Sequence, residues 1–332
     1  MPRRRHLLIL TGIALLALAG CGTSPKACNL SGCCASGADL CPVPQFLYAT
    51  GISGQVTGFP VAAGGALGTP TSINDPAMTL GMTALNNQFL YVSDFQNSSL
   101  DGWSINLSSG ALTPIPGSPF SLGLLAFGAG LATNSTANVI YVAEAAKIGA
   151  YKADATGALT ALSGSPFPAG TNLFLTVDPQ SRFLFASELD PPGGVDAFTI
   201  DSTGALTSVA GSPFPAIPNF VGDTRPNSIV VDSSGSFVYL ALGATNQIAA
   251  FSIVTPGGAL NPVPGSPFAA GNTPLSMVVA NNFLYVSNAL DGTLSGYSIA
   301  PTTGILTPLS GSPFQIRGAA LATDQAGSGD AA

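Results

Sequence analysis

A tripeptide signature, Gly-Ala-Leu, returns along most of this chain at intervals of 45 to 54 residues. Five copies continue into Gly-Ser-Pro-Phe, ending at Phe120, Phe167, Phe214, Phe268 and Phe314. The signatures begin at Gly65, Gly110, Gly157, Gly204, Gly258 and Gly304, the last with Ile305 in place of Ala. A chain made of similar units must bury the apolar face of each unit against its neighbours.

Each unit carries four strand signals separated by turn residues. The first is an apolar stretch such as Ser228 to Asp232, the second is built on aromatics such as Phe89-Leu90-Tyr91, and the third centres on another aromatic such as Trp103. The fourth is the Ala-Leu-Thr segment. Strands with a period of this size predict an all-β propeller, and we interpret the periodic aromatics, Trp103 included, as core between blades.

Counting the strands gives six blades, over residues 45–325, with residues 326–332 as a tail. The first repeat starts at its second strand, and the pattern of a first strand returns at residues 318–324, Gly-Ala-Ala-Leu-Ala-Thr-Asp. We therefore expect this C-terminal segment to pair with the N-terminal blade and close the ring.

Residues 1–20 have the pattern of an export signal. Three arginines precede an apolar run from Leu7 to Ala19, which is too short to span a bilayer. The run ends in Leu18-Ala19-Gly20-Cys21, which matches the lipobox of bacterial lipoprotein signals and predicts a lipid on Cys21. Such a chain is anchored to the membrane of the cell envelope, the outer membrane in a Gram-negative cell. The alternative is an ordinary secretory signal cut nearby.

Residues 21–44 form a tether rich in cysteine. In an oxidising compartment its four remaining cysteines predict two disulfides, with three possible pairings. The alternative, a thiolate metal site, fits no common zinc spacing, so we expect no metal and no cofactor. These cysteines are Cys28, Cys33, Cys34 and Cys41.

The net charge and the single histidine exclude some partners and some catalytic mechanisms. Charged residues make up only 8% of the chain and the net charge is −7, so we expect no nucleic acid as a partner. The single histidine, His6, lies in the export signal. A mature enzyme would have to work without a Ser-His-Asp triad or a histidine-bound zinc.

The repeats resemble the propeller lactonase family. The matching segments are Phe89-Leu90-Tyr91-Val92-Ser93-Asp94, Phe283-Leu284-Tyr285-Val286-Ser287-Asn288 and the Gly-Ala-Leu-Thr and Gly-Ser-Pro-Phe turns. The resemblance covers about residues 45–325. It implies a propeller, typically of seven blades, and an activity like that of 6-phosphogluconolactonase.

Candidate site residues are those that break the repeat on the face where second strands end and first strands begin. Glu144 and Glu188 are the candidate catalytic carboxylates. Arg225 and Arg317 hold one repeat position two blades apart and could bind an anion, although each could instead bridge a nearby acid such as Asp223. Asp94 and Asn288 are the other candidate ligand-binding residues on this face.

Two functions follow from these features. The first is a lipid-anchored propeller that binds a small anion, a glycan or a protein on its top face without turnover. The alternative is a lactonase-like hydrolase in which a glutamate activates water and an arginine stabilises the oxyanion.

Overall fold

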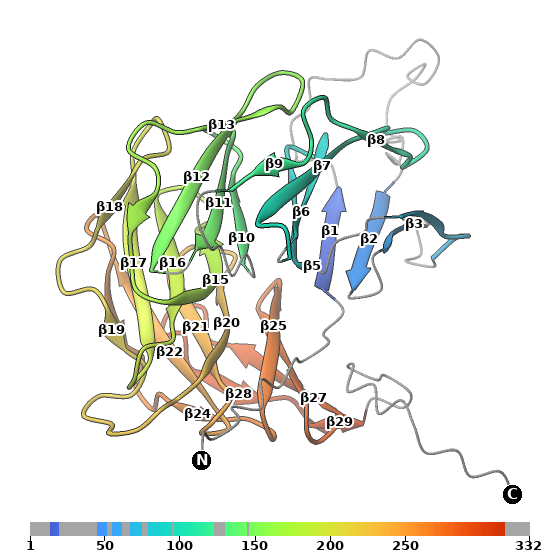
Figure 1. Cartoon of the computed structure of the whole chain (residues 1–332). Helices are drawn as coiled ribbons and strands as arrows, with labels where there is room; N and C mark the ends of the chain where they lie inside the picture. The colour runs from blue at the N-terminus through green and yellow to red at the C-terminus, as the bar shows by residue number, and fades with distance from the viewer. Residues whose placement is uncertain are drawn as a thin grey trace, which may run out of the picture.

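The computed structural model describes residues 14–19, 45–51, 55–61, 67–74, 79–94, 96–122, 130–144 and 146–315. These residues form six antiparallel sheets that follow one another around a centre (Figure 1). The predicted all-β propeller of six blades is confirmed. No helix within these ranges has the length and apolar character needed to cross a membrane.

The strands of the first three blades have the following bounds. Blade 1 contains β1 (Ala14–Ala19), β2 (Gln45–Gly51), β3 (Gln55–Val61) and β4 (Thr71–Asn74). Blade 2 contains β5 (Thr79–Leu85), β6 (Phe89–Asp94), β7 (Ser99–Ile105), β8 (Leu112–Pro114) and β9 (Phe120–Ser121). Blade 3 contains β10 (Leu131–Asn134), β11 (Val139–Glu144), β12 (Lys147–Ala153), β13 (Leu159–Ala161) and β14 (Phe167–Pro168).

The other three blades repeat this arrangement. Blade 4 contains β15 (Asn172–Val177), β16 (Phe183–Glu188), β17 (Gly194–Ile200), β18 (Leu206–Ser208) and β19 (Phe214–Pro215). Blade 5 contains β20 (Pro226–Val231), β21 (Phe237–Leu242), β22 (Gln247–Val254), β23 (Ala259–Pro262) and β24 (Phe268–Ala269). Blade 6 contains β25 (Pro274–Ala280), β26 (Phe283–Asn288), β27 (Thr293–Ile299), β28 (Leu306–Pro308) and β29 (Phe314–Gln315).

The four expected strands pair in sequence order, and blades 2 to 6 add a short fifth strand. This strand, made by the end of Gly-Ser-Pro-Phe, pairs with the start of the third strand, as in Leu100 opposite Phe120. The serine of the motif accepts a hydrogen bond from the third strand, as from the Gly102 amide to Ser118 Oγ at 2.9 Å. The motif therefore binds the chain to the third strand in each of blades 2 to 6, which explains its repetition.

The inner strand of blade 1 differs from the expectation. The structure places β1 there, antiparallel to β2, with Ala17 opposite Tyr48. Ala14–Ala19 belongs to the predicted export signal, and its run of Ala and Leu has the apolar character that an inner strand needs. Residues 318–324, expected at this position, lie outside the described residues, so their pairing stays a prediction.

One contact recurs at four of the five described junctions between blades, the exception being blade 4, which has Phe185 in place of the tyrosine. The phenol of a second-strand tyrosine donates a hydrogen bond to the carbonyl of the glycine in the next Gly-Ala-Leu turn, as from Tyr239 to Gly304 at 2.9 Å. Phe237 packs on the same glycine, where a Cβ would lie 2.3 Å from the ring. Because Gly304 also has a φ of +70°, both its backbone and its neighbour require glycine.

Five buried clusters fill the spaces between consecutive blades. Trp103 belongs to the cluster between blades 1 and 2, which confirms its interpretation as core. Asp178 and Asp232 cap turns by accepting backbone N–H bonds, for example from the Phe237 amide at 2.7 Å. Each fully buried aromatic contributes about 1.5–3 kcal/mol to folding, so the aromatic layers hold the blades together.

Candidate functional site

Polar side chains end the second strands of four blades, and the structure buries all of them. Asp94, Glu144, Glu188 and Asn288 are between 0% and 5% exposed, while blade 5 has Leu242 at this position. A buried carboxyl group needs hydrogen-bond partners or a proton. The hydrogen-bond partners of each side chain therefore show which of these residues could act as an acid or a base.

Blade 4 brings two carboxyl groups together at this end of the sheet. Glu188 lies opposite Gly194 and Ala186 lies opposite Asp196 in the β16–β17 ladder, so Glu188 and Asp196 are diagonal neighbours on one face. Both are 5% exposed. Only the register of the two strands places Asp196 beside Glu188, so the sequence alone does not indicate the pair.

Backbone amides and one hydroxyl hold this pair in place. The Asp190 amide donates to Glu188 Oε1 at 2.7 Å, and the Gly170 amide donates to Asp196 Oδ2 at 2.8 Å. Ser212 Oγ lies 3.3 Å from Asp196 Oδ1. A Cβ at Gly170 would overlap the Glu188 carboxylate, so only glycine allows the loop before β15 to cover the pair so closely.

The electrostatics of the pair favour one shared proton. Burial, together with the negative charges of Asp196 and Asp190, raises the pKa of Glu188 to about 7 although the hydrogen bond from the Asp190 amide opposes the rise. A hydrogen bond with Asp196 also favours the protonated form of Glu188. Near neutral pH the pair can therefore hold one protonated and one ionised carboxyl group, which is the arrangement of an acid–base dyad.

Glu144, the other candidate catalytic carboxylate, has a different environment. Tyr151 Oη donates to Glu144 Oε1 at 3.1 Å. Burial raises the pKa of Glu144, and the Tyr151 hydrogen bond and the charge of Lys147 oppose the rise. Gly149 stands where blade 4 has Asp196, so Glu144 has no second acid beside it in its hairpin. Its catalytic role stays a prediction.

Asp94 and Asn288 bind groups of their own hairpins and neighbouring loops. Asp94 Oδ1 accepts the amides of Gln96 and Asn97 at 2.8 and 3.1 Å, which caps the turn after β6. Asn288 donates to Thr293 Oγ1 at 2.9 Å and to Ser295 Oγ at 2.8 Å. These contacts give both residues a structural role.

Arg225 is exposed on the loop before β20. Its Nε lies 3.3 Å from Asp223 Oδ2, which is the bridge considered as the alternative to anion binding. The same loop reaches the loop after Glu188, because Thr224 Oγ1 donates to the Pro192 carbonyl at 2.8 Å. Arg225 thus lies on a loop that is hydrogen-bonded to the loop after Glu188. Arg317 lies outside the described residues.

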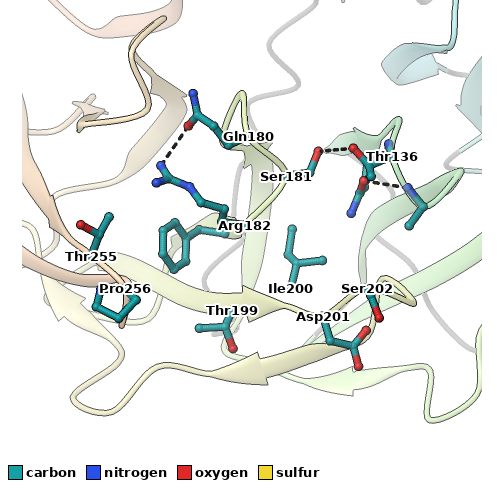
Figure 2. A pocket seen from close by; sticks show the side chains of 13 residues that line it. Thr136, Gln180, Ser181, Arg182, Thr199, Ile200, Asp201, Ser202, Thr255 and Pro256 are labelled. Carbon is teal, nitrogen blue, oxygen red and sulfur yellow. Dashed lines mark hydrogen bonds between the residues drawn. The ribbon is translucent and has the colours of Figure 1, made fainter.

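A shallow groove of about 430 Å³ lies at the opposite ends of blades 3, 4 and 5 (Figure 2). Its one basic side chain, Arg182, is fixed by Asp178 at 2.8 Å, Gln180 at 2.9 Å and the Gly235 carbonyl at 3.0 Å. The contact with Gly235 ties blade 4 to blade 5. The sequence analysis did not single out Arg182, although it breaks the repeat.

No group of three potential metal-ligating side chains occurs in the part of the chain that the structure describes. The cysteines of the tether and Cys21 lie outside that part. The candidate site is built on two buried carboxyl groups, those of Glu188 and Asp196.

Comparison with known proteins agrees with this fold. Residues 187–319 match the family model described as "Lactonase, 7-bladed beta-propeller", and this segment contains both Glu188 and Asp196. No curated protein matches the chain. The match covers less than half of the chain, and the described residues form six blades where that family has seven.

Several solved structures are similar. The periplasmic gluconolactonase PpgL of Pseudomonas aeruginosa has 16% identity and a TM-score of 0.65, over 83% of this chain and 85% of its own. A candidate 6-phosphogluconolactonase of Bacteroides uniformis has 15% identity and a TM-score of 0.65, over 80% and 81%. A virginiamycin B lyase variant of Staphylococcus aureus has 14% identity and a TM-score of 0.58, over 93% and 86%. At these identities the similarity shows the fold alone.

Proposed function

We propose that this chain is an exported, lipid-anchored propeller that hydrolyses a lactone, with Glu188 and Asp196 as its acid–base pair. One observation carries the proposal: two buried carboxyl groups that can share a proton near neutral pH lie within the segment that matches the lactonase family. The comparisons favour hydrolysis, the alternative in the sequence analysis, over a binding module without turnover.

The pair can supply both proton transfers of lactone hydrolysis. The ionised carboxylate takes a proton from water as the water oxygen attacks the carbonyl carbon. The bond between that carbon and the ring oxygen then breaks, and the protonated carboxyl group gives its proton to the ring oxygen. The product is a hydroxy acid, and the pair again holds one proton.

This mechanism needs no histidine, in agreement with a mature sequence that has none. The tetrahedral intermediate carries a negative charge that requires a donor. Arg225 is the candidate for this role, because its loop is hydrogen-bonded to the loop that follows Glu188. Its exposed side chain can leave Asp223, since an exposed ion pair of this kind is worth about 0–1 kcal/mol.

Export and lipid attachment are parts of the same proposal. The run that ends in Leu18-Ala19-Gly20-Cys21 supports cleavage before Cys21 and a lipid anchor. Cleavage there removes β1, so the inner strand of blade 1 must then come from residues 318–324, which carry the same apolar pattern. The similar Pseudomonas protein is itself described as periplasmic. An enzyme in the envelope meets metabolites outside the cytoplasm, which supports an unphosphorylated lactone as its substrate.

Hydrolysis of glucono-1,5-lactone by the purified protein tests the proposal. We expect Glu188→Gln and Asp196→Asn each to lower kcat/KM by about 100-fold or more, the usual contribution of general acid–base catalysis. Asp201→Asn is the matched control, because Asp201 caps an exposed turn at the other end of blade 4. Wild-type activity should fall as pH rises above about 7, since Glu188 then loses its proton.

Unchanged hydrolysis in Glu188→Gln, with an unchanged melting curve, would refute the assignment of the pair. Arg225→Gln should lower kcat more than it raises KM, because the oxyanion exists only after attack.

The binding-module function remains the second candidate. The groove beside Arg182 favours it, and retention of a ligand without turnover there would support it.

A further inference from the structure

The hairpin between the second and third strands of blade 6 shows which side chains converge at this end of a blade. Asn288, at the end of β26, lies opposite Thr293, and Ser295 is two residues further along β27. One atom, Asn288 Nδ2, donates to Thr293 Oγ1 at 2.9 Å and to Ser295 Oγ at 2.8 Å. These three positions therefore surround a point at which a single donor or cation can contact two oxygens.

Blades 3 and 4 have acids at these positions together with a group that offsets their charge. In blade 3 Lys147 lies opposite Glu144. Burial raises the pKa of Glu144, and the positive charge of Lys147 opposes this rise. In blade 4 Glu188 and Asp196 hold the first and third positions and can share one proton. Each of these two hairpins thus offsets negative charge with a lysine or with a proton.

Blade 2 has two acids at these positions and no basic residue nearby in the sequence. Asp94 lies opposite Ser99, and Asp101 is two residues further along β7, as Ser295 is along β27 in blade 6. Since residues alternate between the two faces of a strand, the three side chains of blade 2 lie on one face. The sequence has no Lys, Arg or His in residues 27–146. No basic side chain of blades 1 and 2 therefore offsets the two negative charges.

Ser99 is a second, independent observation at the same point. The residue is 5% exposed, and its Oγ is buried without a hydrogen-bond partner among the described residues. Buried hydroxyl groups almost always have a partner, because an unpaired one loses its bonds to water. Asp94 does not supply this partner, since its carboxylate binds Gln96 and Asn97 of the following turn. The Ser99 oxygen can therefore bind a ligand held on the face that it shares with Asp101.

We propose that this hairpin binds a divalent cation of the calcium type. The Ser99 hydroxyl and the Asp101 carboxylate contact the cation, and Asp94 supplies a second negative charge beside it. The cation takes the place that Asn288 Nδ2 has in blade 6. Calcium prefers hard oxygen ligands, and two carboxylates balance its two charges. This inference does not depend on lactone hydrolysis.

The hairpin provides few protein ligands for such a cation, so water completes its coordination. With two acids and one hydroxyl, we expect a dissociation constant of about 10⁻⁴–10⁻³ M, the range of extracellular calcium modules. That range suits a protein that is exported, because calcium outside the cytoplasm must then be bound at high concentration.

Terbium luminescence tests the site, because Tb³⁺ replaces Ca²⁺ at oxygen ligands and is excited by energy transfer from a nearby tryptophan. Trp103, the single tryptophan of the chain, is two residues from Asp101 on β7, about 7 Å along the strand. The full chain is first treated with a chelator. Excitation of Trp103 should then give terbium emission that saturates and that excess Ca²⁺ removes. Emission that does not saturate, or that excess Ca²⁺ leaves unchanged, would overturn the proposal.

Two variants locate the cation in the same competition experiment. Asp101→Asn should weaken Ca²⁺ binding by about tenfold or more, because the loss of even an outer partner of a metal ligand usually costs that much. Ser99→Ala should weaken it several-fold, since one neutral ligand is lost. Asp154→Asn is the matched control and should bind Ca²⁺ like the wild type. Asp154 caps an exposed turn of blade 3 by accepting the Thr156 amide at 2.7 Å.

Unchanged Ca²⁺ affinity in Asp101→Asn would show an adventitious ion only and would overturn the proposal. If Asp101→Asn does not fold, Ser99→Ala decides, because it removes one hydroxyl that has no partner in the fold. Wild-type affinity in Ser99→Ala would then overturn the site. A wild-type chain that binds no Ca²⁺ would also overturn it, and the acids of blade 2 would share a proton as those of blade 4 do.

Discussion

Replacing Glu188 by Gln tests whether the acid pair makes the fold less stable at alkaline pH. Burial and the charges of Asp196 and Asp190 raise the pKa of Glu188 from 4.5 to about 7. A carboxyl group whose pKa is higher in the folded state stabilises the fold below its unfolded pKa. That stabilisation is lost as pH rises through the folded pKa, here between about 4.5 and 7. At about 1.4 kcal/mol for each pH unit of difference, the loss is about 3 kcal/mol above pH 8.

Urea unfolding at about pH 5 and pH 8.5 measures this effect. Near pH 5 Glu188 carries its proton, and Gln can donate to Asp196 in the same way, so the wild type and Glu188→Gln should have similar free energies of unfolding. Near pH 8.5 the wild type carries two neighbouring charges. The variant should then be more stable by about 3 kcal/mol, because it carries only one.

Glu144→Gln is the control for a general effect of removing a buried carboxylate. Burial also raises the pKa of Glu144, but Tyr151 and Lys147 oppose the rise and no second acid lies beside it in its hairpin. Its free-energy difference from the wild type should change less between the two pH values. The shared-proton argument would be refuted if the wild type and Glu188→Gln differed in free energy of unfolding by the same amount at both pH values.

Three other predictions concern the scaffold and its anchor. Tyr239→Phe should lower the free energy of unfolding by about 1–2 kcal/mol, because the buried Gly304 carbonyl loses its donor; unchanged urea unfolding would show that this bond contributes nothing. Labelled fatty acid should appear on the wild-type chain and disappear in Cys21→Ser, and label that persists would contradict the lipobox assignment. Deletion of residues 317–332 should lower the melting temperature sharply if residues 318–324 form an inner strand, and a truncated chain that melts like the full one would make them a tail.

Most of the fold could be predicted from the sequence because the repeat is read directly along the chain. The second strands, such as Phe237–Leu242, and the Ala-Leu-Thr strands lie where their patterns indicate. The fifth strands could not be predicted, since two residues such as Phe120 and Ser121 carry no periodic signal. The assignment of β1 to blade 1 was also missed, because Ala14–Ala19 fits an export signal and a buried strand equally well.

The candidate site was harder to predict than the fold. Glu188 was found because it breaks the repeat at the end of a second strand. Asp196 was missed because its pairing depends on the register of the β16–β17 hairpin, which the sequence does not give. A comparison of the third strands gives only part of this signal, since blades 3, 5 and 6 have Gly149, Ala249 and Ser295 at this position but blade 2 has Asp101.

The hydrogen bonds between tyrosine and glycine have a consequence for how such a protein can change in evolution. Four of the five described junctions use this bond, and the fifth keeps an aromatic ring, Phe185, at the same position, so most blades could follow one another with the same contacts. Duplication or loss of one whole repeat leaves each remaining junction chemically intact. The number of blades in a protein built this way can therefore change by whole repeats while the contacts at the junctions stay the same.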